Sequence, residues 1–177
     1  MSAVTKVLMS AGAVVLAGAM TAGSPSAQQP GMRGMGPGGM HDPEHMKDMQ
    51  MFHELLAERG RITRQVTVIG NGVDTVTESD DAKVAGLIRA HVVSMTARVE
   101  QARPIHMRDP LFRALFANAD RIVMKHENTA KGVRVIETSA DPYVAKLIQA
   151  HAAVVSAFLV NGFEEMHKNH EVPTRDP

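Results

Sequence analysis

The sequence contains no cysteine and no tryptophan, and aromatic residues make up only 3% of the chain. The absence of cysteine excludes disulfides, thiolate metal sites, cysteine nucleophiles and the covalent haem attachment of c-type cytochromes. The scarcity of aromatic residues argues against aromatic cages and base-stacking platforms. Neither sign of charge is in excess, because 19 Lys and Arg balance 19 Asp and Glu. A nucleic-acid partner, which would require a basic surface, is therefore not expected.

Motifs of several common enzyme classes are also missing. The sequence has no GxSxG, no glycine-rich phosphate loop before a helix and no HExxH. Its carboxylates at predicted strand-to-helix corners are explained by helix capping and by the helix dipole. We find no catalytic constellation, and the sequence favours a binding or structural role over catalysis.

Residues 1–26 have the features of a secretory signal peptide. Lys6 provides a short positive start, residues 7–20 are apolar and uncharged, and small residues follow. The apolar stretch is short for a membrane span, and no later segment approaches about 18 consecutive apolar residues. We therefore expect a periplasmic protein with no membrane span after signal cleavage.

Methionine and histidine, with 13 and nine residues, are the unusual components of the sequence. Residues 27–42 are rich in Gly, Met and His and predict a flexible arm before a single domain over 43–170 and a tail over 171–177. Six Met and three His lie between residues 32 and 53. Thioethers suit Cu(I), and imidazoles suit Cu(II), Zn or Ni. The arm is thus either a copper-scavenging segment or a tolerant linker.

The domain contains an internal repeat with an offset of 60 residues. Residues 61–91 align without a gap to 121–151 with 12 identical positions, where average composition would give about two. Each copy, at about 43–101 and 110–160, has the pattern of a helix, two short strands and a long helix. We predict an α+β fold in which the duplicated αββα unit forms one antiparallel sheet covered by helices, with a pseudo-twofold axis.

Capping residues and turns mark the predicted elements. Helix starts are predicted at Asp42-Pro43, Asp81, Asp109-Pro110 and Asp141-Pro142. Strands are predicted at 62–69, 73–78, 122–128 and 133–138. The first helix is expected to run to about Arg59, and Asn71-Gly72 predicts a type I′ hairpin turn.

His91 and His151 occupy the same position of the two copies, on the apolar stripe of each long helix. A twofold axis would bring their imidazoles together, with Met95 one turn after His91. Strand alternation adds Met124 and His126 on the inner face of the second copy. Two or three imidazoles with a thioether suit copper, and two imidazoles alone suit axial ligation of haem. Alternatively, His91 and His151 are neutral core histidines that hydrogen-bond to each other or to the backbone.

His45, Met49 and His53 form a second candidate metal site, because their spacing of four places them on one face of the first helix. Alternatively, Met49 and His53 cover the core while His45 is solvated. Met166 and His170 have the same spacing near the C-terminus, where we expect an exposed, fraying helix end.

Three long motifs occur at residues 72–81 (GVDTVTESDD), 103–112 (RPIH followed by DPLF) and 126–158 (HENTAKGVRVIETSADPYVAKLIQAHAAVVSAF). On these motifs, residues 52–170 resemble a family of small exported bacterial proteins of unassigned function. The resemblance implies export but transfers no activity and no site residues. The Met/His arm is less characteristic of that family.

The leading interpretation is a periplasmic metal-binding protein that sequesters copper or transfers it to a periplasmic redox or metal-transfer protein. The metal ligands would be the Met and His side chains of the two candidate sites. One alternative is a haem-binding or electron-transfer accessory protein. The other is a non-catalytic structural or interaction domain. Each of the three interpretations is compatible with a homodimer.

Overall fold

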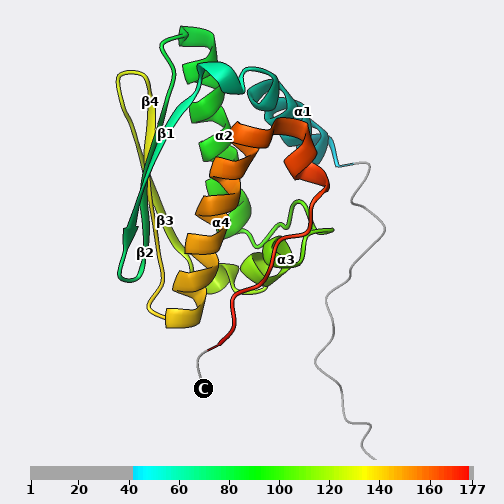
Figure 1. Cartoon of the computed structure of the whole chain (residues 1–177), viewed down its shortest axis with the longest axis vertical. Helices are drawn as coiled ribbons and strands as arrows, with labels where there is room; N and C mark the ends of the chain where they lie inside the picture. Colours follow the sequence, from blue (N-terminus) through cyan, green and yellow to red (C-terminus); the bar gives the residue numbers. More distant parts are fainter. Residues whose placement is uncertain (1–41, 176–177) are drawn as a thin grey trace, which may run out of the picture. The chain divides into compact units, whose positions relative to one another are not determined.

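The computed structural model describes residues 42–175. This part of the chain has an α+β fold with one four-stranded antiparallel sheet and four helices (Figure 1). The coarse fold prediction is therefore confirmed. The predicted signal peptide at 1–26 and almost all of the arm at 27–42 lie outside the described residues.

The helices and strands begin within one or two residues of their predicted starts. The helices are α1 (Pro43–Ala57), α2 (Ala82–Glu100), α3 (Pro110–Phe116) and α4 (Pro142–Asn161). The strands are β1 (Thr63–Ile69), β2 (Gly72–Glu78), β3 (Val123–Asn128) and β4 (Gly132–Thr138). Short 3₁₀ helices follow at η1 (Arg59–Arg61), η2 (Ala119–Arg121) and η3 (Gly162–His167). The side chains of Asp42, Asp81, Asp109 and Asp141 cap the four α-helices, which confirms the predicted helix starts.

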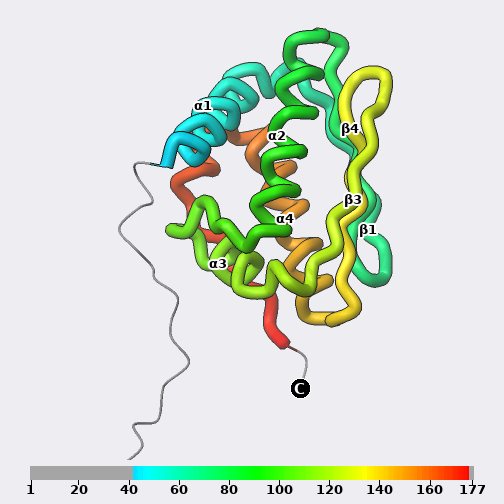
Figure 2. The backbone as a smooth tube through the Cα atoms, turned by 180° about the vertical axis from the view of Figure 1, so that it is seen from behind, coloured from blue at the N-terminus to red at the C-terminus, as the bar shows by residue number. Residues whose placement is uncertain are grey.

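The sheet has the strand order β1-β2-β4-β3, and all of its neighbours pair antiparallel. Helices α2 and α4 lie against one face of the sheet, and α1 and α3 lie on the far side of these helices (Figures 1 and 2). Helix α2 packs mainly on β4 and β3, whereas α4 packs mainly on β2 and contacts β1 and β4 to a smaller extent. Each long helix therefore covers the strands of the other half of the chain.

Hydrogen bonds tie each long helix to the hairpin turn of the other half. Arg89 of α2 donates from Nε to the carbonyl oxygen of Gly132 at 3.0 Å. Gln149 of α4 donates from Nε2 to the carbonyl oxygen of Ile69 at 3.1 Å. In the centre of the sheet, Thr75 pairs with Val135, which lies 60 residues later.

The first hairpin differs from its predicted form. Ile69 pairs with Gly72, so the two-residue turn is Gly70-Asn71 and not Asn71-Gly72. Neither Gly70 nor Asn71 has a positive φ, and the predicted type I′ turn is therefore wrong. Gly72 meets a different demand, because a Cβ there would lie 1.9 Å from the backbone oxygen of Glu137 on β4. Close packing of two central strands, and not turn geometry, requires this glycine.

Apolar side chains fill the space between the sheet and the helices in two adjoining clusters. The larger cluster includes Leu56, Leu111, Leu147, Ile148 and Phe158. The smaller one includes Met51, Leu55, Val84, Ile88, Val133 and Val135. The segment Pro142–His167 is long and apolar enough to cross a membrane by length and composition. In the structure α4 packs against the sheet and buries Val144, Leu147 and Ile148 there.

Candidate functional site

A cavity of about 200 Å³ lies between the sheet and the helices. Its walls are mainly apolar and come from α1, α2, α3, α4 and the inner face of the sheet. The apolar lining includes Phe52, Ile62, Met95, Ile105, Phe112, Ile122, Val155 and Leu159. The polar lining consists of Arg64, Thr75, Thr77, His91, His106, Glu137 and His151. A concave apolar site with a few convergent polar groups is the usual form of a small-molecule site.

His91 and His151 both line this cavity, as the sequence predicted for an interior pair. The ring of His91 stacks on Phe52 with a centroid distance of 6.0 Å, and the ring of His151 contacts Phe112 edge to face at 5.1 Å. Within residues 42–175 no hydrogen bond joins the two imidazoles, and His91 Nδ1 is buried without a partner. The predicted alternative of a hydrogen-bonded His–His pair is therefore wrong for the described structure.

Both imidazoles are neutral at physiological pH. Burial lowers the pKa of His91 to about 4, and the nearby charge of Asp48 opposes this shift. Burial likewise lowers the pKa of His151 to about 4, with further lowering by Arg64 and then by His91. Arg64, His91 and His151 all line the same cavity. A neutral imidazole offers one N–H donor and one nitrogen acceptor to a ligand.

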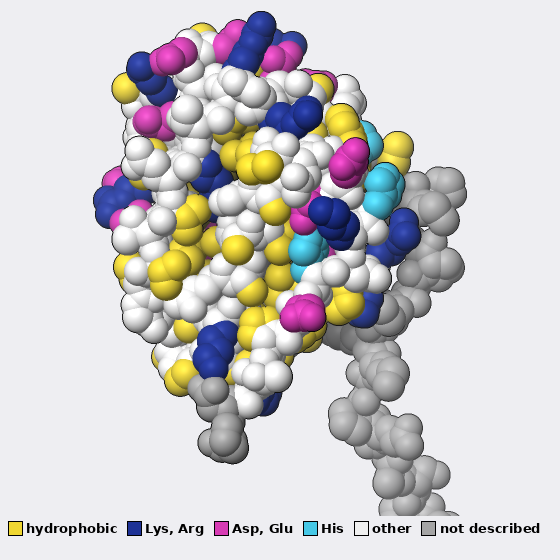
Figure 3. Space-filling model, viewed as in Figure 1, with side chains coloured by type: hydrophobic (Ala, Val, Ile, Leu, Met, Phe, Trp, Pro, Cys, Tyr) yellow, Lys and Arg dark blue, Asp and Glu magenta, His cyan; other side chains and the backbone are white. Residues whose placement is uncertain are grey.

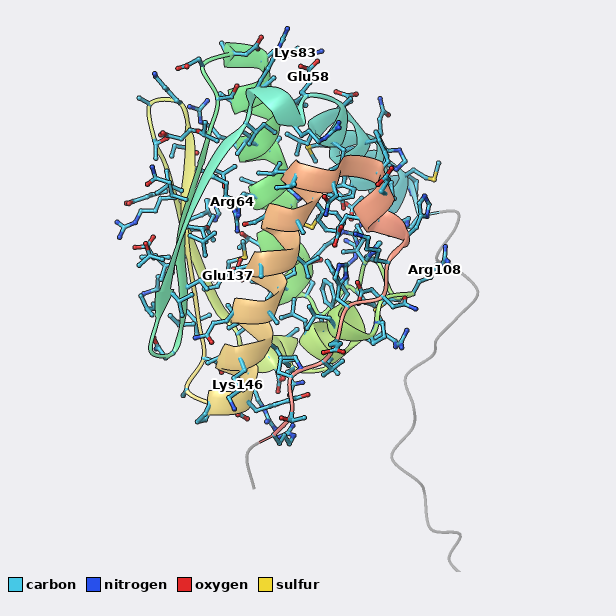
Figure 4. All side chains as sticks on the ribbon, in the orientation of Figure 1. Glu58, Arg64, Lys83, Arg108, Glu137 and Lys146 are labelled. Carbon is cyan, nitrogen blue, oxygen red and sulfur yellow. The ribbon has the colours of Figure 1, made fainter. Side chains whose placement is uncertain are left out.

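Arg64 of β1 and Glu137 of β4 add two charges to the sheet side of the cavity. Figure 4 shows both side chains in the space between the sheet and α4. Arg64 donates from Nη1 to Thr77 Oγ1 at 2.8 Å, whereas its Nε is buried without a hydrogen-bond partner. Burial lowers the pKa of Arg64 and raises the pKa of Glu137, and in each case the other charge opposes the shift. The two groups form no ion pair within 4.0 Å in the described residues.

The loop between α2 and α3 contributes His106 and Ile105 to the lining. His106 has a φ of 57°, and Ala102 in the same loop has a φ of 49°, both in the left-handed region. Such backbone costs about 1–3 kcal/mol for a residue with a side chain and is concentrated at functional sites. The His106 ring contacts Phe112 at 4.8 Å, and its Nε2 is buried without a partner. Burial lowers the pKa of His106 as well, although Asp109 opposes it.

Of the other residues of the predicted interior metal site, the two methionines lie in the cavity wall and the histidine does not. Met95 of α2 and Met124 of β3 line the cavity, in agreement with the prediction. His126 is exposed, although its Nδ1 lies 3.2 Å from Oγ1 of Thr96, a buried residue of α2. The prediction of an interior His126 is wrong, because β3 is an edge strand of the sheet and His126 remains exposed beside α2.

The three residues of the predicted metal site on the first helix do not lie together either. Met49 of α1 lines the cavity, whereas His53 is exposed and contacts Phe163 edge to face at 5.6 Å. His45 is half-buried and lies one turn before Met49. Only the thioether of this cluster reaches the cavity, so the three side chains do not converge on one point.

His170 is held in a hydrogen-bond network, whereas the sequence predicted an exposed, fraying helix end there. His170 Nδ1 bonds to Asp109 at 2.5 Å, and Nε2 bonds to Glu165 at 3.0 Å. Burial acts to lower the pKa of His170, but the hydrogen bonds to both carboxylates outweigh it and raise the pKa. The prediction of a fraying end is wrong, since this network and the contact of Arg175 with the Tyr143 ring hold the segment against the domain.

A buried ion pair joins α1 to α2 and was not predicted. Arg98 Nε bonds to Asp48 at 2.5 Å, and each side chain is only 5% exposed. Ser94 donates a second hydrogen bond to Asp48. This contact positions α1, and with it Phe52 and Met49, over the cavity.

The sequence did not identify Arg64, Glu137 or His106 as site residues. A signal was present for two of them, because Arg64 of β1 alternates with Ile62, just before the strand, and Glu137 alternates with Val135 on β4. A charged residue on the apolar face of a strand is unusual unless it has a partner or a function. His106 lies in an irregular loop, for which periodicity gives no information.

Comparison of the chain with protein-family models, curated proteins and solved structures gave no match. Within residues 42–175, no three or more His, Asp or Glu side chains gather in an arrangement suited to a metal ion. A metal in the cavity would therefore depend on methionine sulfur beside the two imidazoles.

Proposed function

We propose that the protein binds a small, largely apolar molecule in the cavity between the sheet and the helices. The single observation that carries this proposal is an apolar cavity whose polar lining residues include three with a buried polar atom that has no hydrogen-bond partner. Those atoms are Arg64 Nε, His91 Nδ1 and His106 Nε2. Native proteins rarely leave buried polar atoms without partners, so a ligand that supplies them accounts for all three.

The size of the cavity supports a ligand of modest dimensions. An engineered apolar cavity of about 150 Å³ binds benzene, and this one has about 200 Å³. It is smaller than the pockets of about 300–1,000 Å³ that hold drug-sized molecules. A haem, which is larger still, therefore has less support than a compact ligand, although His91 and His151 both face the cavity.

The symmetry of the repeat supports a binding role for the cavity, because equivalent residues of both copies form its walls. Phe52 and His91 in the first half correspond to Phe112 and His151 in the second, and both pairs are in contact. The reciprocal hydrogen bonds of Arg89 and Gln149 fit the same relationship. We infer that a pseudo-twofold axis relates the two αββα units and passes close to the Thr75–Val135 pair. The cavity lies beside this axis, where both units contribute to its walls.

We also infer from the signal-like residues 1–26 that the protein acts in the periplasm, as the resemblance to small exported bacterial proteins implies. A carrier or sensor of a small apolar molecule would be consistent with that compartment. The proposal includes no membrane span in the mature chain.

A neutral fluorescent molecule, N-phenyl-1-naphthylamine, tests the cavity directly. We expect its emission to rise on binding to the full chain, with saturation at one molecule per chain. Val92→Phe and Val155→Phe place a larger side chain in the cavity from α2 and α4, and each should weaken binding by about tenfold or more.

Two matched variants control for general effects of an added phenyl group. Val93 and Val160 lie on the same two helices and are 55% and 77% exposed. Val93→Phe and Val160→Phe should leave the affinity unchanged. Equal binding by all four variants, with melting temperatures that show folded protein, would place the molecule on the surface and contradict the proposal. Figure 3 shows that apolar side chains are also exposed on the face it presents, so this control is needed.

Copper binding in the same cavity is a second candidate function. It is favoured by two neutral imidazoles, one with a free buried nitrogen, beside the thioethers of Met49, Met95 and Met124. Neutral nitrogen and thioether sulfur are suitable ligands for Cu(I). The positive charge of Arg64 in the same cavity counts against a bound cation.

Titration with Cu(I) in the presence of a competing chelator tests this candidate. We expect His91→Ala and His151→Ala to remove a tight site, and His53→Ala, on the exposed face of α1, to retain it. Removal of residues 28–46 should lower the stoichiometry only if the arm adds further sites. Equal titration curves for the wild type and for both cavity variants would rule out copper at His91 and His151.

A further inference from the structure

The sheet side of the cavity carries one charge of each sign, and they come from different strand pairs. Arg64 on β1 faces Thr77 on β2, whereas Glu137 on β4 faces Met124 on β3. In the described part of the chain, no other charged residue lines the cavity. The two halves of the repeat are therefore unequal here, because one supplies Arg and Thr where the other supplies Met and Glu.

The guanidinium of Arg64 has N–H donors without a hydrogen-bond partner, and such donors favour an anionic ligand. Only Nη1 has a hydrogen-bond partner, Thr77 Oγ1 at 2.8 Å, and Nε is buried without one. A planar guanidinium binds a carboxylate through two parallel N–H···O hydrogen bonds. Burial removes hydration from this cation, and the charge of Glu137, which forms no ion pair with it, only partly compensates for that loss.

The other basic groups of the cavity do not add positive charge. Burial lowers the pKa values of His91, His106 and His151, so all three imidazoles are neutral near pH 7. His151 lines the same cavity as Arg64 and can donate an N–H to a ligand there. One cation with neutral donors around it, in a cavity that already contains Glu137, matches at most a single negative charge and not the two of a phosphate monoester.

We propose that the ligand of this cavity is an apolar monocarboxylate whose carboxylate binds Arg64 beside Thr77 and His151. Its hydrocarbon part would lie among the apolar residues of α2, α4 and the sheet. This inference rests on the proposed function and specifies its ligand class. Glu137 would then disfavour a second carboxylate or an inverted orientation, because like charges repel in a poorly hydrated cavity.

Three molecules with the same eight-carbon chain test this inference: octanoate, 1-octanol and octylamine. Each is titrated into the full chain at pH 7, and displacement of N-phenyl-1-naphthylamine provides a second readout. We expect octanoate to bind about tenfold or more tightly than the alcohol or the amine, since a charge-assisted hydrogen bond is stronger than a neutral one.

Two variants change the charges in opposite directions. Arg64→Gln should remove the preference for octanoate while retaining the binding of 1-octanol. Glu137→Gln should strengthen octanoate binding, because it removes the only negative charge in the described cavity lining. Arg64→Lys retains the charge but not the planar fork, and it should retain an intermediate preference. Glu137→Gln keeps the test informative if Arg64→Gln does not fold.

The outcomes separate this inference from the proposed function. If N-phenyl-1-naphthylamine binds in the cavity but 1-octanol or octylamine competes as well as octanoate, the cavity is real and the carboxylate assignment is wrong. A loss of octanoate affinity in Glu137→Gln would likewise overturn the assignment. If neither the fluorescent molecule nor any eight-carbon compound binds, the proposed function and this inference both fail.

Discussion

The imidazole of His91 stacks on the phenyl ring of Phe52, with 6.0 Å between the centroids and 23° between the planes. This contact joins α2 to α1 at the edge of the cavity. It keeps the imidazole away from bulk water, and burial is the main reason for its low pKa. Several measurable properties follow from this interior and from the contacts that support it.

Stability should fall as the pH decreases from 6.5 towards 4. His91 and His151 have pKa values of about 4 in the folded protein, against 6.5 for an ordinary histidine. The unfolded chain therefore takes up protons first, and the free energy of unfolding should drop by about 1.4 kcal/mol per pH unit for each histidine in this window. Urea denaturation at several pH values measures the slope.

Asparagine variants identify the source of that slope. His91→Asn and His151→Asn should each reduce the slope, whereas His53→Asn, at an exposed position, should not. A wild-type free energy of unfolding that is constant from pH 6.5 to 4.5 would show that the two imidazoles are hydrated.

His170 should affect stability in the opposite pH range. Its pKa is raised because the hydrogen bonds to Asp109 and Glu165 outweigh the effect of burial. Its stabilising contribution is full below pH 6.5 and is lost as the pH rises through the raised value. His170→Gln should therefore destabilise the protein at pH 6 and weaken the loss of stability above pH 6.5. His167→Gln, an exposed neighbour, serves as the control and should leave the profile unchanged.

The ion pair between Asp48 and Arg98 should be a large contributor to the position of α1. Asp48→Ala leaves a buried guanidinium without its carboxylate, and we expect a loss of about 3–5 kcal/mol in the free energy of unfolding. Asp80, whose side chain is 88% exposed in its pair with Lys131, provides the comparison. Asp80→Ala should cost little, because exposed ion pairs are hydrated and screened. Equal losses in the two variants would contradict the burial of the Asp48–Arg98 pair.

Gly132 should not tolerate a side chain. A Cβ at this position would lie 2.0 Å from the backbone oxygen of Thr77 on the neighbouring strand. Gly132→Ala should therefore separate β2 from β4 and lower the free energy of unfolding by about 1–3 kcal/mol or more. A Cβ at Gly60 has no atom within 4 Å, so Gly60→Ala should change stability by about 0.5 kcal/mol or less. Thermal or urea unfolding of both variants makes the comparison.

Several elements of the fold could be predicted from short sequence patterns. Asp81 and Asp141 cap α2 and α4 as expected, because a helix start depends on the few residues that follow it. The positions of His91 and His151 on the inner faces of these helices follow from the same local periodicity. The hairpin at Gly70-Asn71 was displaced by one residue from its prediction, because contact with β4 decides where Gly72 lies.

The sequence by itself determined where helices and strands begin and which of their faces are apolar, since these properties depend on neighbours within one or two turns. Only the tertiary structure decided that Arg64 and Glu137 share one cavity, that His126 faces solvent and that His170 binds Asp109. Residues 61 positions apart come into contact through the packing of whole elements. That packing follows from the combined burial of many side chains, and a local sequence pattern contains no record of it.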